Sequence, residues 1–147
     1  MSVATDTLEA GTSLTGASRT ITDAEIALLP AIMGAISPLF HDEETARQTK
    51  LGRRVLYGPA LLGIAIACTE PLLHDHVIAL VAITDVRFTR AVGVGDTVTA
   101  SLTITERQAK PDKPGDLLFV ADVVRNQRDE VVLEFCRVVM VKRGADR

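Results

Sequence analysis

Side chains that can transfer protons gather in residues 34–46. The segment holds one imidazole and three carboxylates in sequence, namely His41, Asp42, Glu43 and Glu44. Imidazole titrates near neutrality and can serve as a general acid or base. His41 is therefore the first candidate for a catalytic residue.

A structural role explains the same residues. Ser37-Pro38 favours an extended or turned backbone, and acidic residues stabilise the positive end of a following helix. Neighbouring side chains in an extended loop point to opposite sides. We therefore interpret His41 and Asp42 as residues of a helix start or a surface hydrogen bond, with catalysis by His41 as the alternative.

Two other clusters are interpreted as loops. His74-Asp75-His76 contains metal-binding side chain types, but they are crowded and the spacing suggests no fourth ligand. Gly93-x-Gly95-Asp96 sits between predicted strands with no helix after it, which is typical of a hairpin turn and not of a phosphate-binding loop. The sequence predicts neither a metal nor a cofactor.

Composition narrows the class of protein. Of 147 residues, 47% are hydrophobic and 3% aromatic, so the core must be aliphatic. The formal net charge of −3, with mixed signs and no basic cluster, argues against nucleic-acid binding. Cys68 and Cys136 lie far apart in apolar runs, which suits free thiols in the cytoplasm.

No leader or membrane span is expected. The N-terminus lacks a basic stretch followed by an apolar core, and no run approaches the roughly 18 apolar residues of a spanning helix. Residues 1–17 are rich in Ser, Thr, Gly and Ala and offer little apolar area to bury. We predict a flexible arm over residues 1–17 and one domain over residues 18–147.

Two main helices are predicted. Thr22 and Glu25 form a capping-box pattern, which indicates a helix over residues 23–33 that ends at Gly34. A short second helix begins at residues 42–44. Residues 59–73 are apolar nearly all round until Glu70, so we expect a central helix enclosed by the rest of the domain.

Strands dominate the second half of the chain. Polar and apolar residues alternate through residues 98–105, as in a sheet with one wetted face. The predicted strands cover residues 78–89, 97–107, 116–125 and 131–142. Helices followed by consecutive strands predict an α+β fold in which an antiparallel sheet wraps around the central helix.

The segment from Gly34 to Ala46 resembles the signature G-D-x-N-P-[LIV]-H-x(5)-[AS] of (R)-specific enoyl-CoA hydratases and other MaoC-like proteins. Gly34, Pro38, Leu39 and Ala46 agree with it. Residues 86–98 are similar to a second family pattern, V-R-F-x-x-P-V-x-x-G-D-T-L. The resemblance covers residues 19–143 and implies a hot-dog fold, a dimer, and a thioester of CoA or acyl-carrier protein as ligand.

The signature lacks its catalytic pair. Ala35 stands where the hydratases have Asp, and Phe40 where they have His. Neither side chain can hold and release a proton. An aromatic at the His position also occurs in the N-terminal, non-catalytic half of double hot-dog dehydratases, where the domain shapes the acyl tunnel. Phe40 could equally fill the core.

The resemblance names further substrate-binding candidates. It implies that the Gly58 amide, at a helix start, polarises the thioester carbonyl, although a turn glycine before Pro59 is the competing role. Tyr57, where the family often has His, could donate to a substrate oxygen and is the second catalytic candidate, or could cap the pocket rim. Ser37 replaces the family's Asn and could orient a ligand or serve the turn.

Three functions remain open at this level. The chain could bind and process an acyl thioester in the hydratase and dehydratase group. It could be a non-catalytic subunit of a homodimer or of a heterodimer with a dyad-bearing hot-dog partner. It could instead support isomerisation, cyclisation or thioester hydrolysis, the last requiring a carboxylate in the pocket from Asp42, Glu43 or Asp85.

Overall fold

The computed structural model describes residues 8–143. Its elements follow in the order β1 (Ser13–Thr20), α1 (Asp23–Ile32), α2 (Pro38–His41), α3 (Glu43–Arg47), α4 (Gly58–Leu73), β2 (Val77–Phe88), β3 (Thr97–Gln108), β4 (Asp116–Arg125) and β5 (Val131–Val141).

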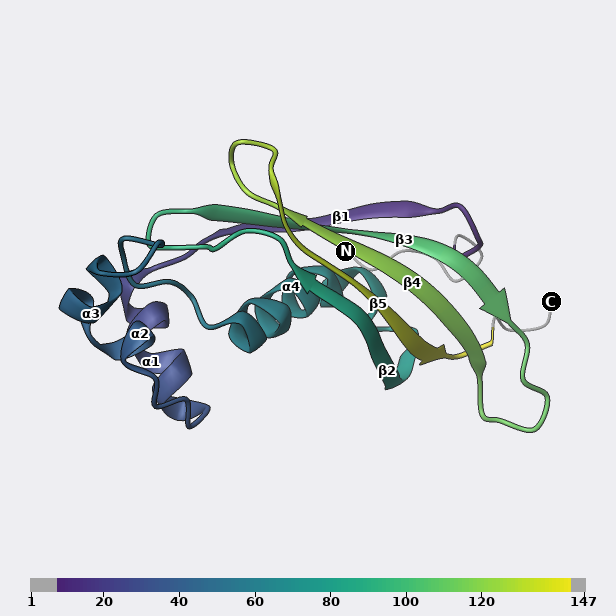
Figure 1. Cartoon of the computed structure of the whole chain (residues 1–147). Coiled ribbons are helices and arrows are strands. Elements are labelled where there is room, and N and C mark those ends of the chain that lie inside the picture. Colours follow the sequence, from purple (N-terminus) through teal and green to yellow (C-terminus); the bar gives the residue numbers. More distant parts are fainter. Residues whose placement is uncertain (1–7, 144–147) are drawn as a thin grey trace.

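A curved antiparallel sheet covers one long helix (Figure 1). The five strands of the described chain lie in the order β1-β3-β4-β5-β2, so β1 and β2 are the two edges. Helix α4 lies under the concave face, while α1, α2 and α3 form a lobe beyond one end of the sheet (Figure 1). The predicted α+β class is confirmed.

The core forms between α4 and the alternating strands. Every second residue along most of β3, β4 and β5 is buried, as a pleated sheet with one face toward a helix requires. Two clusters of buried side chains result. One surrounds the N-terminal half of α4 and includes Leu61 and Ile64, and the other surrounds Leu73 at its C-terminal end.

One face of α4 remains open, which corrects the expectation of a fully enclosed helix. Pro59, Gly63 and Ala67 recur every fourth residue and are exposed. The sheet lies on one side of the helix, so residues at this spacing on the other side are not covered. Among the described residues, no helix has both the length and the apolar character needed to cross a membrane.

Strand β1 corrects the predicted arm. Residues 13–17, assigned to a flexible segment, form the first part of β1 and pair with β3. The composition argument failed because an edge strand is held by backbone pairing and needs little apolar area. Hydroxyl pairs add to it, such as Ser13 with Thr103 (2.9 Å between oxygens) and Ser18 with Thr99 (2.7 Å). Residues 1–7 of the predicted arm lie outside the described range.

The lobe confirms one sequence signal and corrects another. The capping box of α1 is present, because the Thr22 side chain accepts from the Glu25 amide and the Glu25 carboxylate accepts from the Thr22 amide. The segment after Ser37, predicted to be extended or turned, is the short helix α2 and not an extended loop. Proline is compatible with the first helical position, because the N–H that it lacks would have no partner within the helix at that position.

Strand β1 approaches α4 very closely at Gly16. A Cβ added at this glycine would lie 2.2 Å from the carbonyl oxygen of Cys68. The β1–β3 register shifts between Thr15 and Ser18, so an irregularity in the strand accompanies this contact. Glycine therefore lets the backbone of an edge strand rest against the backbone of α4.

We predict that Gly16→Ala lowers the free energy of unfolding by about 1–3 kcal/mol, because the added methyl group must displace backbone atoms. Ala17→Gly is the matched control, since Ala17 is exposed one residue further on, and it should cost less than about 1 kcal/mol. Urea unfolding of both variants measures the difference. Equal losses of unfolding free energy in the two variants would show that the close approach of Gly16 to the Cys68 backbone does not determine the cost of the substitution.

Candidate active site

A shallow cavity of about 330 Å³ lies where the lobe meets the start of α4. The end of β2 with the loop that follows it (residues 88–92) and the loop before α4 supply most of its walls, and the lobe and the start of α4 supply the rest. The residues that matter for its chemistry include Leu39, Phe40, Gly58, Phe88, Thr89 and Arg90.

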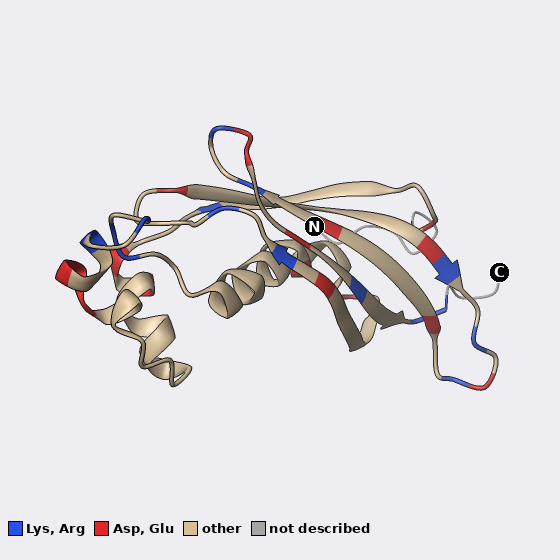
Figure 2. Ribbon diagram, viewed as in Figure 1, with Lys and Arg blue, Asp and Glu red and all other residues tan. Residues whose placement is uncertain are grey.

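Gly58 brings the backbone of α4 to this cavity. It is the first residue of the helix, and no side chain caps the helix start. Pro59 lacks an N–H, so the amides of Gly58 and Ala60 are the donors of the first three helical residues. No charged residue precedes Glu70 in α4, so the N-terminal turns carry only the partial positive charge of the helix (Figure 2).

Phe88 lies directly over Gly58. A Cβ added at Gly58 would be 3.2–3.4 Å from three carbons of the Phe88 ring. The absence of a side chain therefore lets an aromatic wall come close to the helix start. Sequence analysis placed Phe88 in a family-like pattern but did not assign it to the site.

Phe40 also lines the cavity and packs on Tyr57. Their ring centroids are 5.1 Å apart with an interplanar angle of 71°, an edge-to-face arrangement. Such a pair stabilises by about 0.5–1.5 kcal/mol beyond the buried area. The contact ties α2, in the lobe, to the residue that precedes α4.

The other candidates from the hydratase-like segment do not line this cavity. Ser37 is exposed and caps α2, its hydroxyl oxygen accepting from the Leu39 amide at 3.4 Å. His41 is also exposed, and its Nε2–H donates to the carbonyl oxygen of Ala35 at 2.6 Å. The argument from an extended loop was wrong, because α2 is helical, but the imidazole nevertheless bonds to the backbone.

The nearby carboxylates are also engaged elsewhere. Asp42 caps α3, and hydrogen bonds from Thr45 and the amide of Glu44 hold the pKa of Asp42 below its usual range. Glu43 accepts from Arg54 at 2.8 Å. Asp85 lines a different cavity, beside Arg87 and Glu134. Of the three carboxylates considered for thioester hydrolysis, none lines the cavity at Gly58.

Polar groups in the cavity walls are few. The Thr89 hydroxyl donates to the carbonyl oxygen of Val131 at 2.6 Å, and Arg90 lies 3.8 Å from the Glu130 carboxylate. Neither residue type is a proton carrier near neutral pH. Among the described residues that line the cavity, none is an imidazole or a carboxylate. The site can bind an apolar group beside the backbone amide of Gly58.

Comparison with known proteins decides the family. The model of the "MaoC like domain" matches residues 7–118. This chain belongs to the MaoC-like family. It is also 35% identical over 126 residues to a β-methylmalyl-CoA dehydratase of Chloroflexus aurantiacus, with 85% of this chain and 36% of that protein aligned. The chain thus spans about a third of the length of that relative.

Solved structures superpose closely on this chain. A monoamine oxidase regulatory protein from an Archaeoglobus species superposes with a TM-score of 0.85 at 29% identity, covering 97% of both chains. A Mycobacterium tuberculosis protein described as a double hot-dog fold superposes with a TM-score of 0.73 at 24% identity, covering 90% of this chain and 39% of that one. The predicted hot-dog fold is confirmed.

We predict that Phe40→Leu lowers the free energy of unfolding by about 1 kcal/mol and speeds amide exchange in residues 38–47, because the ring contact that anchors α2 is lost. Tyr57→Phe keeps both rings and should change stability by less than about 0.5 kcal/mol. Urea unfolding and hydrogen exchange test both variants. A larger effect from Tyr57→Phe would mean that the hydroxyl, and not the ring, holds the lobe.

Proposed function

We propose that this chain is an acyl-thioester-binding member of the MaoC-like hydratase and dehydratase group that does not itself hydrate or dehydrate. The observation that carries the proposal is the composition of the cavity at Gly58, where aromatic walls meet the uncapped start of a helix without an imidazole or carboxylate. A thioester carbonyl would accept from the Gly58 amide, and the acyl group would pack on Phe40 and Phe88.

The surroundings of the two substituted positions support the non-catalytic part of the proposal. Phe40 is held against Tyr57, and the Ala35 carbonyl accepts from the neighbouring imidazole. His41 therefore uses one ring nitrogen to fix the loop that would have to carry a catalytic group. Water addition needs a base and an acid near the reacting carbons, and neither is supplied from these positions.

We predict that the purified chain binds hexanoyl-CoA but does not hydrate crotonyl-CoA above the buffer rate. The double variant Ala35→Asp/Phe40→His should gain hydration, because it restores both proton-transferring groups, whereas Ala35→Asn/Phe40→Gln should not. Calorimetry measures binding and the loss of the enoyl absorbance measures hydration.

Two outcomes would contradict parts of this proposal. Failure to bind hexanoyl-CoA would remove the thioester ligand. Hydration by the unmodified chain that disappears in His41→Ala would show that His41 is catalytic after all.

We also propose that the functional form is a dimer joined through β2. This edge strand exposes large apolar side chains, which include Ile78, Leu80, Val81, Val86 and Phe88. An uncovered apolar edge invites pairing with another chain. Phe88 belongs both to this edge and to the cavity at Gly58, so pairing would place the thioester beside the seam. The partner is a second copy or a dyad-bearing hot-dog chain.

We predict that Val81→Lys shifts the protein to monomer in light scattering, because a charge would be buried at the proposed seam. Thr15→Lys is the matched control on β1, the other edge strand, and should leave the molecular mass unchanged. If neither variant changes the mass of a dimeric protein, another surface joins the subunits. An unmodified chain that is monomeric alone would indicate a heterologous partner.

A further inference from the structure

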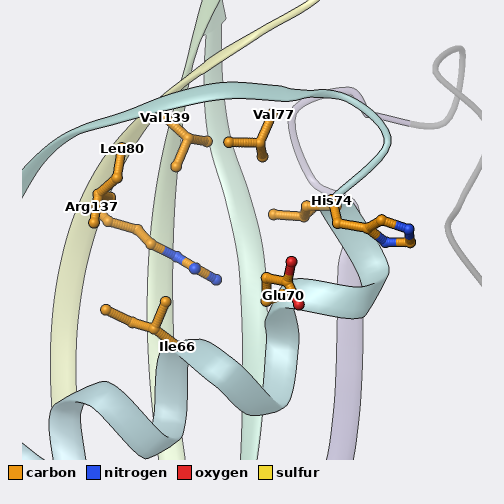
Figure 3. Close-up of a pocket in the computed structure, with 8 residues that line it drawn as sticks. Ile66, Glu70, His74, Val77, Leu80, Arg137 and Val139 are labelled. Atoms are coloured by element: carbon orange, nitrogen blue, oxygen red, sulfur yellow. The ribbon is translucent and has the colours of Figure 1, made fainter.

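A second cavity lies between the C-terminal half of α4 and the edge formed by β5 and β2 (Figure 3). Its volume is about 250 Å³. Apolar side chains form most of its wall, namely Ile66, Leu73, Val77, Leu80 and Val139. An acyl chain would be well accommodated by such a wall.

Three polar residues interrupt this apolar wall, Glu70, His74 and Arg137, and only Arg137 is buried. It is 3% exposed and projects from β5 into the cavity toward α4 (Figure 3). Its Nε donates to Asp122 at 2.9 Å, and its Nη2 donates to Asp122 and to the Thr69 hydroxyl oxygen, both at 2.8 Å. The other terminal nitrogen, Nη1, has no partner among the described residues.

The Nη1 group is open to the cavity. A guanidinium has five N–H groups, and among the described residues no side-chain nitrogen or oxygen is both fully buried and without a partner. The Nη1 hydrogens therefore provide a site for an acceptor atom that enters the apolar cavity. The bidentate contact with Asp122 and the bond to Thr69 fix the direction in which Nη1 points.

The charges around the cavity favour an uncharged acceptor. Asp122 pairs with the guanidinium at 2.8 Å, so the charge of Arg137 already has a partner within the protein. Burial raises the pKa of the Asp122 carboxyl to about 6. Glu70 adds a further carboxylate to the cavity wall. A carboxylate ligand would be repelled by the carboxylates of Glu70 and Asp122, whereas an uncharged ketone or hydroxyl oxygen would not.

Different residues of the same two elements line the two cavities. Helix α4 contributes Gly58 to the first and Ile66 and Glu70 to the second, and β2 contributes to both. The helical rise of 1.5 Å per residue puts roughly 12–18 Å between these parts of α4. A long acyl chain that follows α4 from a thioester at Gly58 would reach Arg137 with its distal end.

We propose that the second cavity binds the distal end of a long acyl group, and that Arg137 selects chains carrying a keto or hydroxyl oxygen near that end. This rests on the proposed thioester site at Gly58. Arg137 is then a specificity-determining residue, distant from the thioester. Sequence analysis missed it, although a single arginine within the apolar residues 135–141 was a visible signal.

Three CoA thioesters of equal chain length test the selectivity: dodecanoyl-CoA, 11-oxododecanoyl-CoA and the half-thioester of dodecanedioic acid. We expect the keto compound to bind the full chain roughly tenfold more tightly than dodecanoyl-CoA in calorimetry, as a new hydrogen bond to a charged donor allows. The diacid thioester should bind no more tightly than dodecanoyl-CoA.

Variants of the cavity separate selectivity from folding. Arg137→Lys keeps a charge beside Asp122 but removes Nη1, and should abolish the tenfold preference. Val139→Phe fills the cavity without altering Arg137, and should weaken all three long thioesters but not hexanoyl-CoA. Val138→Phe is the matched control, because Val138 is the adjacent residue of β5 and lies outside the cavity lining. It should leave all four affinities unchanged.

The outcomes distinguish this inference from the proposed function. Equal binding of the keto and unsubstituted thioesters, or tightest binding of the diacid, would overturn the selectivity while the thioester site stands. Unchanged keto preference in Val139→Phe would place the distal end elsewhere. If hexanoyl-CoA also fails to bind, the thioester site itself is wrong, and this inference falls with it.

Discussion

The contact between α4 and the concave face of the sheet is the constraint on which the rest of the molecule depends. A sixteen-residue helix with one charged side chain cannot be stable in water alone, and the alternating faces of β3, β4 and β5 cover one side of it. The sheet curves over the helix, and at Gly16 the edge strand β1 comes within backbone contact of it (Figure 1). Both cavities are spaces left along this one contact.

Most of the fold followed from local patterns. The Thr22 and Glu25 pair marked α1, the apolar run after Gly58 marked α4, and alternation marked β3. The first strand was missed because it has no alternating pattern of its own. Its stability comes from pairing with β3, which is distant in sequence. Helix α2 was missed because four residues are too few to show a period.

The site was predictable in part. Family-like spacing singled out Phe40, Tyr57 and Gly58, and the structure brings these three together at one end of α4. The sequence could not show that His41 donates a hydrogen bond to the Ala35 carbonyl oxygen, because that bond depends on how the loop between the two residues turns. The role of Arg137 could not be predicted from the sequence either, because its partners Asp122 and Thr69 come from β4 and α4.

The two edges of the sheet differ in chemistry, and this difference limits how copies of the chain can associate. Strand β1 presents serine and threonine hydroxyls that are already bonded to β3, whereas β2 presents aliphatic side chains and a phenylalanine. Joining β1 of one copy to β2 of the next would propagate without end, as in a fibre. Such a junction would place the polar edge strand β1 against the apolar edge strand β2. The asymmetry therefore favours closed, finite assemblies and protects an aliphatic sheet from open-ended polymerisation.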